Sequence, residues 1–392
     1  MFVMKEHECP HFGLCGGCSL RDMNYEMQIL QKEKAVKELF SGKIPEELFL
    51  PAIPSPRVDG YRNKMEFTFG NERKDGPLTL GLHQKKSFHN IIPVQSCRIC
   101  DEDFRAIRSF TESFFREREI PFYHRKSHIG VLRHLLIRKA AKTGEILCDL
   151  VTTSVGTDEK LLSDWKEGLL TLPLTGKFAG ILHTRNDRVA DAVTDEGTVV
   201  LYGNDHFTEE LLGLRFHITP FSFFQTNSLG AEKLYETARS FLSDVEGRKG
   251  TVFDLYSGTG TIAQLLSPAA EKVIGVELVE EAVEAAKENA AANGITNCSF
   301  LAGDVLKVLD QVAEKPDCIV LDPPRSGVHP KALKKILRYE VPFILYISCK
   351  AKSLAEGFPT FEYHGYRPVK AQCIDLFPFT ENVETVVLFT RL

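Results

Sequence analysis

The side chains best suited to chemistry in this sequence lie where short apolar runs end. Cys349 and Asp322 each follow such a run, and Glu384 comes shortly after the segment Asp375–Pro378. A cysteine thiolate and a carboxylate base together suit covalent catalysis at an unsaturated carbon. Substitution at carbon 5 of a pyrimidine needs this pair, because a thiolate must first add to carbon 6 and a base must later remove the carbon-5 proton. Taken alone, a cysteine at a strand end is more often part of the core.

Asp322 begins the sequence Asp-Pro-Pro-Arg. Enzymes that methylate amino groups carry a similar segment, in which an aromatic residue follows the prolines and stacks on the target base. Arg325 holds that position here. The segment therefore argues against methylation of an amino group.

A turn containing two glycines follows another apolar run and suits a nucleotide-like ligand. The turn spans Asp254–Thr261, and its glycines let the backbone bend sharply and approach a ligand closely. Glu277 ends the next apolar run, where an acid can bind ribose hydroxyls or simply face solvent. A dinucleotide site would have a third glycine near Gln264, and none is present. The pattern instead resembles motif I of class I S-adenosylmethionine-dependent methyltransferases, in which Asp304 has the usual place for a contact to adenine.

Several other cysteines, separate from Cys349, have the spacing of metal ligands. Cys9, Cys15 and Cys18 lie close together, and Cys97 and Cys100 are candidates for a fourth position. The N-terminus lacks the layout of a secretory signal, so we expect a cytoplasmic protein whose clustered thiols are reduced and bind metal. Four thiolates suit an iron–sulfur cluster or a structural zinc ion, and the spacing alone does not decide. The other cysteines are expected in the core: Cys148, Cys298, Cys318 and Cys373.

The elements that must position these residues change in character along the chain. Residues 1–50 hold the cysteine segment and an amphipathic helix over about 24–40, with apolar residues at Met27, Leu30, Ala35, Val36 and Leu39. A proline-rich linker opens a β-rich, largely antiparallel domain over 51–217, with one helix near 103–117. Over 218–392 strands and helices alternate, which predicts an α/β catalytic domain with a doubly wound parallel sheet and ligands at the carboxyl ends of its strands.

The charge and hydropathy of the chain indicate which kinds of partner it can bind. The chain has a net charge of −5, but residues 57–142 contain 18 lysines and arginines against 10 aspartates and glutamates. Such a local surplus fits a surface for phosphates, and it fits a merely solvated surface equally well. No apolar run approaches the roughly 20 residues that span a bilayer, so no membrane association is expected.

Together these segments resemble the RNA uridine-5 methyltransferase family, whose members methylate bacterial 23S rRNA and the T-loop of tRNA. The resemblance covers nearly the whole chain and rests on five segments: Phe224–Asn227, Asp254–Gly260, Asp322–Arg325, Ser348-Cys349 and Asp375–Glu384. It implies that Cys349 is the nucleophile and Glu384 the base of an S-adenosylmethionine-dependent enzyme. The pocket for cofactor and target base would be lined by Gln225, Tyr256, Gly258, Thr261, Glu277, Asp304 and Asp322. Residues 60–64 also match a family segment and are expected to face RNA.

The resemblance extends to the cysteines and to the substrate. Cys9, Cys15, Cys18 and Cys97 match the set that holds a [4Fe–4S] cluster in some members, with a structural or RNA-positioning role. Many relatives carry an RNA-binding TRAM barrel before this motif, and we expect none here because only eight residues precede Cys9. A cluster without that barrel resembles the compact 23S rRNA enzymes more than the tRNA enzyme. We therefore expect a monomer that acts on 23S rRNA rather than on tRNA.

Two departures from the family pattern lie beside the expected catalytic pair. The family reads Ser-Cys-Asn-Pro where Lys350 and Ala351 follow Cys349, and Asn382 replaces a histidine two residues before Glu384. One hypothesis is that the charge of Lys350 favours the thiolate. Three alternatives remain: a T-loop tRNA uridine-5 methyltransferase, a non-catalytic RNA-binding factor with the same fold, and a nicotinamide-dependent oxidoreductase, which would leave the catalytic pair without a role.

Overall fold

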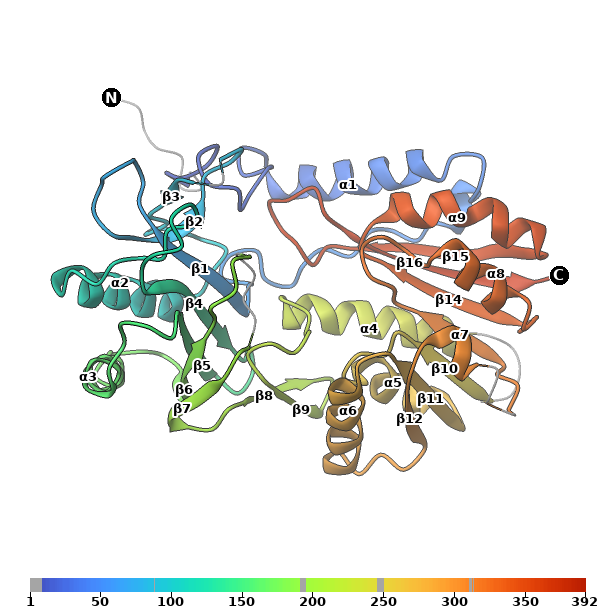
Figure 1. Ribbon diagram of the computed structural model, residues 1–392. Coiled ribbons are helices and arrows are strands. Elements are labelled where there is room, and N and C mark those ends of the chain that lie inside the picture. The colour runs from blue at the N-terminus through green and yellow to red at the C-terminus, as the bar shows by residue number, and fades with distance from the viewer. Residues whose placement is uncertain (1–8, 88, 191–194, 245–249, 310–311, 313) are drawn as a thin grey trace. The chain divides into compact units, whose positions relative to one another are not determined.

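The computed structural model describes residues 9–87, 89–190, 195–244, 250–309, 312 and 314–392 (Figure 1). The chain forms two compact units. Unit 1 comprises Met1–Met23, Arg57–Glu210 and His217–Ser228, and unit 2 comprises Asn24–Pro56, Leu211–Phe216 and Leu229–Leu392. This division differs from the expected one, because the helix that follows the cysteine segment belongs with the catalytic region. The hairpin of β8 (Phe207–Leu211) and β9 (Leu214–Ile218) carries the chain from one unit to the other and back.

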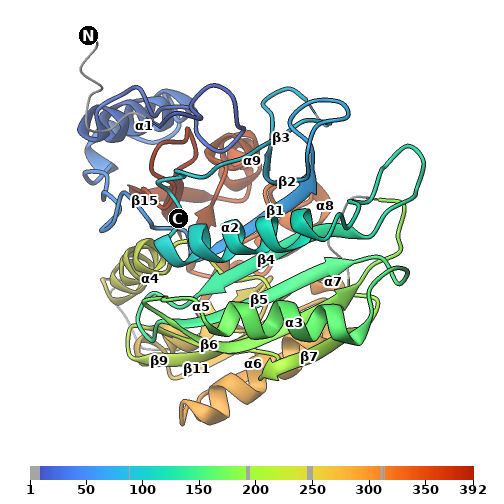
Figure 2. The same cartoon turned by 90° about the vertical axis from the view of Figure 1, so that its left-hand side faces the viewer.

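Unit 1 is built on a seven-stranded sheet with the order β3-β2-β1-β4-β5-β6-β7. The strands are β1 (Lys64–Gly70), β2 (Thr79–His83), β3 (Ile91–Ile92), β4 (Leu132–Lys139), β5 (Glu145–Thr152), β6 (Lys177–Arg185) and β7 (Thr198–Gly203). Figure 2 shows α2 (Glu102–Glu117) and α3 (Glu159–Leu170) over one face of this sheet, where Trp165 is fully buried.

The expected antiparallel character of unit 1 holds for most neighbouring strands, with one exception. β5 and β6 pair in parallel, whereas the other neighbours pair antiparallel. A parallel pair needs a crossover connection, usually a helix, and α3 is that connection. The sequence analysis predicted neither α3 nor β6.

Unit 2 contains the predicted α/β sheet, with the order β12-β11-β10-β13-β14-β16-β15. The strands are β10 (Thr251–Leu255), β11 (Lys272–Glu277), β12 (Cys298–Ala302), β13 (Cys318–Leu321), β14 (Phe343–Ser348), β15 (Tyr366–Ile374) and β16 (Glu384–Arg391). Strands β10 to β14 are parallel, and β16 runs antiparallel to both β14 and β15. The doubly wound prediction is thus confirmed, with an antiparallel hairpin added at one end.

Helices flank both faces of this sheet (Figure 1). They are α1 (Tyr25–Leu39), α4 (Ser228–Ser243), α5 (Thr261–Leu266), α6 (Glu280–Ala292), α7 (Val305–Val308), α8 (Pro330–Leu337) and α9 (Ala351–Tyr363). Phe40, just after α1, packs with Phe358 of α9 at a ring distance of 5.3 Å, and both are buried. No helix within the described ranges is long and apolar enough to cross a bilayer.

One part of the α1 prediction is wrong. Four of the five apolar positions expected to face the core are exposed, namely Met27, Leu30, Ala35 and Leu39, and only Val36 is buried. Gln28 and Lys32 are buried in their place. The helix is therefore oriented by polar partners rather than by its apolar periodicity.

Candidate functional site

The carboxyl ends of parallel strands meet at one edge of a sheet, and most of the predicted site residues of unit 2 follow such ends. The glycine turn follows β10, Glu277 ends β11, Asp304 comes after β12, Asp322 after β13 and Cys349 after β14. Strand β16 begins at this edge because it runs the opposite way. Its first residue, Glu384, therefore joins the same group.

Cys349 and Glu384 are brought together by the register of β14 and β16. Ser348 pairs with Thr385, so the next residues along, Cys349 and Glu384, lie opposite each other. Side chains opposite each other on antiparallel strands have their Cβ atoms about 5 Å apart. The nucleophile and base suggested by the sequence thus share one site, although 35 positions separate them in the chain.

The thiol of Cys349 is half-buried and surrounded mainly by negative charge. Burial, followed by the carboxylates of Glu384 and Asp322, raises the pKa of the Cys349 thiol to about 11. Arg325 opposes this rise. Arg325 is thus a cation that favours the thiolate, and the effect assigned to Lys350 stays a prediction.

Two carboxyl groups lie near Cys349, those of Glu384 and Asp322. Glu384 is the more buried of the two, with 2% of its surface exposed. Burial, followed by the charge of Asp322, raises the pKa of Glu384 to about 8. Burial also raises the pKa of Asp322 to about 7. A carboxylate with such a pKa is a much stronger base than an ordinary glutamate, and its pKa lies near the working pH, where general base catalysis is most efficient.

The glycine turn has a backbone that leaves room for a ligand. Tyr256, Gly258 and Gly260 have φ values of 69°, 53° and 73°, in the left-handed region that glycine adopts most readily. A Cβ on Gly260 would lie 2.6 Å from the ring of Phe300, so this glycine allows the turn to pack. A Cβ on Gly258 would meet nothing within 4 Å, so this glycine borders open space.

Glu277 holds this turn through its carboxylate. Its Oε2 accepts a hydrogen bond from the Gly258 amide at 3.0 Å, and its Oε1 accepts from the amides of Leu278 and Val279. Burial, followed by the charge of Asp304, raises the pKa of Tyr256, which places the phenol and that carboxylate near each other. Thr261 is buried at the start of α5.

Asp254 is a site residue whose side chain the sequence analysis did not single out. It is fully buried beneath the turn, and neither of its carboxylate oxygens has a hydrogen-bond partner among the described residues. Burial, followed by the charge of Asp322, raises its pKa well above the ordinary range. Such a group needs a compensating partner, and the only signal in the sequence was its place at the head of the glycine motif.

Gln225 belongs to unit 1, whereas the other predicted pocket residues belong to unit 2, and its role in the pocket stays a prediction. Its carbonyl oxygen accepts a hydrogen bond from Asn63 Nδ2 at 2.8 Å, and the Asn63 amide donates to Thr226. Asn63 is buried. Part of the segment 60–64, expected to face RNA, therefore fixes the Phe224–Asn227 segment.

Comparison with known proteins shows the family. The family model described as tRNA (Uracil-5-)-methyltransferase matches residues 200–392. A protein of Clostridium acetobutylicum named an uncharacterized RNA methyltransferase is 50% identical over 386 residues, which cover 98% of this chain and 84% of that protein. The chain belongs to the tRNA (uracil-5-)-methyltransferase family.

Other family members and a solved structure agree with this assignment. An uncharacterized RNA methyltransferase of Bacteroides thetaiotaomicron is 36% identical over 400 residues, covering 97% of this chain and 87% of its own. The crystal structure of Pyrococcus abyssi tRNA (uracil-54, C5)-methyltransferase with S-adenosyl-L-homocysteine has a TM-score of 0.77 and 26% identity, covering 96% of this chain and 86% of the other. The prediction of an S-adenosylmethionine-dependent RNA methyltransferase is confirmed, and the oxidoreductase alternative falls away.

The two departures from the family pattern now have a structural place. Lys350 is the N-cap of α9, with no side-chain capping bond, and Ala351 is its first residue. Asparagine at the N-cap and proline at the first position are favourable helix starts, so this exchange weakens the start of α9. Asn382 accepts a hydrogen bond from Arg325 Nη2 at 2.8 Å, which ties the loop before Glu384 to the Asp322 segment.

The predicted cluster ligands lie in unit 1, around one small apolar cavity. Its walls include all four: Cys9, Cys15, Cys18 and Cys97. Burial, then the charges of Cys97 and Cys15, raises the pKa of Cys18 to about 12, which shows that these thiols are mutually close. The Cys100 thiol donates to the Cys97 carbonyl at 3.4 Å and does not line the cavity. As placed, no group of three or more histidine, cysteine or acidic side chains among the described residues could hold a metal ion.

Proposed function

We propose that this family member methylates carbon 5 of a uridine in RNA through a covalent bond between Cys349 and carbon 6. The observation that carries the proposal is the pairing of a half-buried cysteine with a buried, high-pKa glutamate at one end of β14 and β16. The glycine turn after β10 lies at the same edge of the sheet. This arrangement supplies the nucleophile and base that the reaction requires.

The residues act in a fixed order. Cys349 Sγ, as the thiolate favoured by Arg325, adds to carbon 6, and the electron pair of the carbon 5–carbon 6 double bond moves towards carbon 5 and the 4-oxygen. S-adenosylmethionine, when bound, supplies an electrophilic methyl group to carbon 5 and leaves as S-adenosylhomocysteine. Glu384 then accepts the carbon-5 proton, the double bond re-forms, and the thiolate of Cys349 departs. The proton passes from Glu384 to solvent.

The residues around the glycine turn fit S-adenosylmethionine. Gly258 leaves open space beside the backbone, Glu277 ends β11 and Asp304 follows β12, at strand ends where acids can bind ribose hydroxyls and adenine. Asp254, whose carboxylate oxygens have no partner among the described residues, gives the turn a polar floor. We include Gln225 and Thr261 in this pocket on the strength of the family resemblance.

For the substrate we propose 23S rRNA, with tRNA as the second candidate. The cysteine set resembles that of the 23S rRNA enzymes, whereas the similar solved structure from Pyrococcus abyssi acts on tRNA according to its name. Purified protein incubated with S-adenosylmethionine and transcripts of each RNA should produce 5-methyluridine in one of them, measured by mass spectrometry of the digested nucleosides. Cys349→Ala should abolish the product. Methylation at another atom, or of neither RNA, would contradict the proposal.

We also propose a [4Fe–4S] cluster on Cys9, Cys15, Cys18 and Cys97. The proposal is supported by the resemblance of this cysteine set to that of family members with a cluster, and by the one cavity that all four cysteines line. In a cluster each thiolate binds a different iron. The cluster would stabilise the fold of unit 1, because the chemistry needs no electron transfer.

The cluster can be tested on the anaerobically purified protein. We expect about four irons and four acid-labile sulfides per chain, with the broad visible absorption of a cluster. Stoichiometric zinc in a colourless protein would contradict the proposal. We further propose that the enzyme is a cytoplasmic monomer, which light scattering of the purified protein would check for the oligomeric state.

A further inference from the structure

Helix α1 presents polar side chains to the inside of unit 2. Tyr25, Gln28 and Lys32 are spaced by three and four positions, so they share one face of the helix. Gln28 is 0% exposed and Lys32 is 4% exposed. Burying an amide and an ammonium is unfavourable unless specific partners compensate. This face of α1 therefore marks a specific contact.

The partners of this face lie in the loop that joins β15 to β16, the loop that ends at Glu384. Lys32 Nζ lies 2.8 Å from Asp375 Oδ1 and donates to the Phe377 carbonyl at 3.0 Å. The hydroxyl of Tyr25 donates to Asp375 Oδ2 at 2.9 Å, and the Phe377 amide donates to Asp375 Oδ1 at 2.9 Å. Both oxygens of a carboxylate that is 1% exposed are thus bound.

The same helix also holds the next turn of the loop. Phe379 has φ +66°, a left-handed conformation that is strained for any residue with a side chain. Its amide donates to Gln28 Oε1 at 2.9 Å, and its ring lies 6.4 Å from that of Tyr25. Such strain persists where the surroundings over-determine it, typically near functional sites.

From this turn, hydrogen bonds continue towards the catalytic residues. The Thr380 hydroxyl donates to the Phe377 carbonyl, which is also the acceptor for Lys32. The Asn382 amide donates to Thr380 Oγ1 at 3.2 Å, and Asn382 Oδ1 accepts from Arg325. Glu384 follows two residues later.

We propose that α1 is a positioning clamp for the catalytic base. Through Lys32 and Asp375 it fixes the loop so that Glu384 faces the carbon-5 proton. Lys32 and Asp375 are positioning residues, since they reach the reacting atoms only through this loop. The inference rests on the proposed function, in which loss of the carbon-5 proton is the step that Glu384 carries out.

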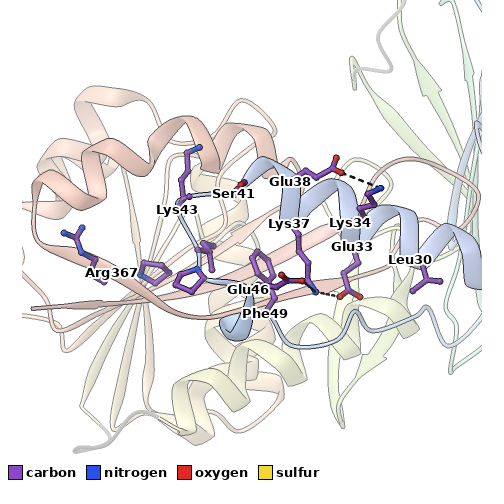
Figure 3. A pocket seen from close by; sticks show the side chains of 14 residues that line it. Leu30, Glu33, Lys34, Lys37, Glu38, Ser41, Lys43, Glu46, Phe49 and Arg367 are labelled. Atoms are coloured by element: carbon purple, nitrogen blue, oxygen red, sulfur yellow. Dashed lines mark ion pairs between the residues drawn. The ribbon is translucent and has the colours of Figure 1, made fainter.

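The opposite face of α1 supplies a matched control. Figure 3 shows the ion pair of Lys34 with Glu38 and that of Lys37 with Glu33 on this helix. The side chain of Lys34 is 78% exposed and its nitrogen lies 3.8 Å from Glu38. Lys34→Met therefore makes the same chemical change on the same helix without touching the loop.

The test compares Lys32→Met with Lys34→Met on ordinary uridine RNA. A small displacement of the base should lower kcat by about 10-fold or more, with kcat/KM for RNA changed by no more than about 2-fold, because elimination follows methyl transfer and is the only step that slows. Undissociated adduct between Cys349 and RNA should then accumulate on a denaturing gel. Gln28→Ala keeps the ion pair of Lys32 with Asp375, and it should show a smaller decrease in kcat and less accumulated adduct. This variant replaces Lys32→Met in the test if Lys32→Met does not fold.

The outcomes separate this inference from the proposed function. Lys32→Met that only lowers the melting temperature and active fraction, with no adduct, would show a purely structural pair and overturn the inference. An adduct that accumulates in Glu384→Gln but in neither Lys32→Met nor Gln28→Ala would also overturn the inference. The proposed function would then still stand. Absence of adduct in Glu384→Gln as well, with no 5-methyluridine from the native enzyme, would overturn the proposed function itself.

Discussion

Glu384 should destabilise the folded protein at neutral pH, so replacing it by glutamine should stabilise the fold while stopping turnover. The carboxyl is 2% exposed, and burial, followed by the charge of Asp322, raises its pKa from 4.5 to about 8. Between these two values the folded state holds a proton that the unfolded chain releases. The contribution of this group to stability is therefore fully present below pH 4.5 and is lost as pH rises through about 8.

The size of the effect follows from the two pKa values. Each pH unit between them is worth about 1.4 kcal/mol, so the free energy of unfolding falls by about 1 kcal/mol by pH 5 and by roughly 3 kcal/mol by pH 7. Glutamine has nearly the shape of the protonated acid and cannot ionise, so its burial carries no such pH-dependent cost. The free energy of unfolding of Glu384→Gln should therefore exceed that of the native protein by about 2 kcal/mol more at pH 7 than at pH 5.

Urea unfolding followed by fluorescence at both pH values measures this difference. Glu381→Gln is the matched control, because it makes the same change three positions away in the same loop at an exposed site. We expect no pH-dependent gain in that control. A gain in Glu384→Gln that is equal at the two pH values, or a loss of stability at pH 7, would refute the assignment of a buried, high-pKa base.

Three further predictions concern the helix start, the glycine turn and the cysteines. Lys350→Asn should supply the missing N-cap of α9 and raise stability by about 1 kcal/mol, with methyl transfer retained; an unchanged melting temperature would contradict the capping argument. Gly258→Ala should weaken S-adenosylmethionine binding, measured by calorimetry, with a modest loss of stability, whereas Gly260→Ala should lower the melting temperature further, because its Cβ would collide with packed side chains. Equal effects of the two would count against the open space beside Gly258. Cys97→Ser should lose iron and Cys100→Ser should keep it, and the reverse result would reassign the fourth ligand.

The position of the site at the carboxyl ends of the parallel strands could be predicted from the sequence, because it follows from local patterns. Short apolar runs alternate with helical segments after residue 218, and strand ends in such a fold converge. Asp322 and Cys349 were found in this way. Glu384 was found through its family motif, and its place opposite Cys349 depends on an antiparallel strand that the alternating pattern does not indicate.

The orientation of α1 could not be predicted, because it depends on partners far away in the chain. Apolar periodicity placed Met27 and Leu30 inward, but the ion pair of Lys32 with Asp375 spans 343 residues and determines which face is buried. Local sequence carries no trace of such a pairing. Buried polar positions in a helix of this kind are visible only once the fold brings their partners together.

The charge surplus over 57–142 was only partly a surface property. Arg108, Arg133 and Arg138 are each at most 2% exposed and donate to backbone carbonyl groups. These arginines hold unit 1 together and do not face phosphates. Counting charges along a sequence cannot separate such structural arginines from a surface that binds RNA, because burial is decided by tertiary packing.

The central claim is that Cys349 bonds to carbon 6 of a uridine, and RNA that contains 5-fluorouridine tests it most directly. Fluorine at carbon 5 leaves no proton for Glu384 to remove, so the thiolate cannot depart after methyl transfer. We predict a stable protein–RNA adduct with S-adenosylmethionine present, whose mass includes one methyl group and whose peptide map places the bond on Cys349. The adduct should be absent in Cys349→Ala. An RNA that is methylated in its normal form but gives no adduct when fluorinated would contradict the covalent mechanism.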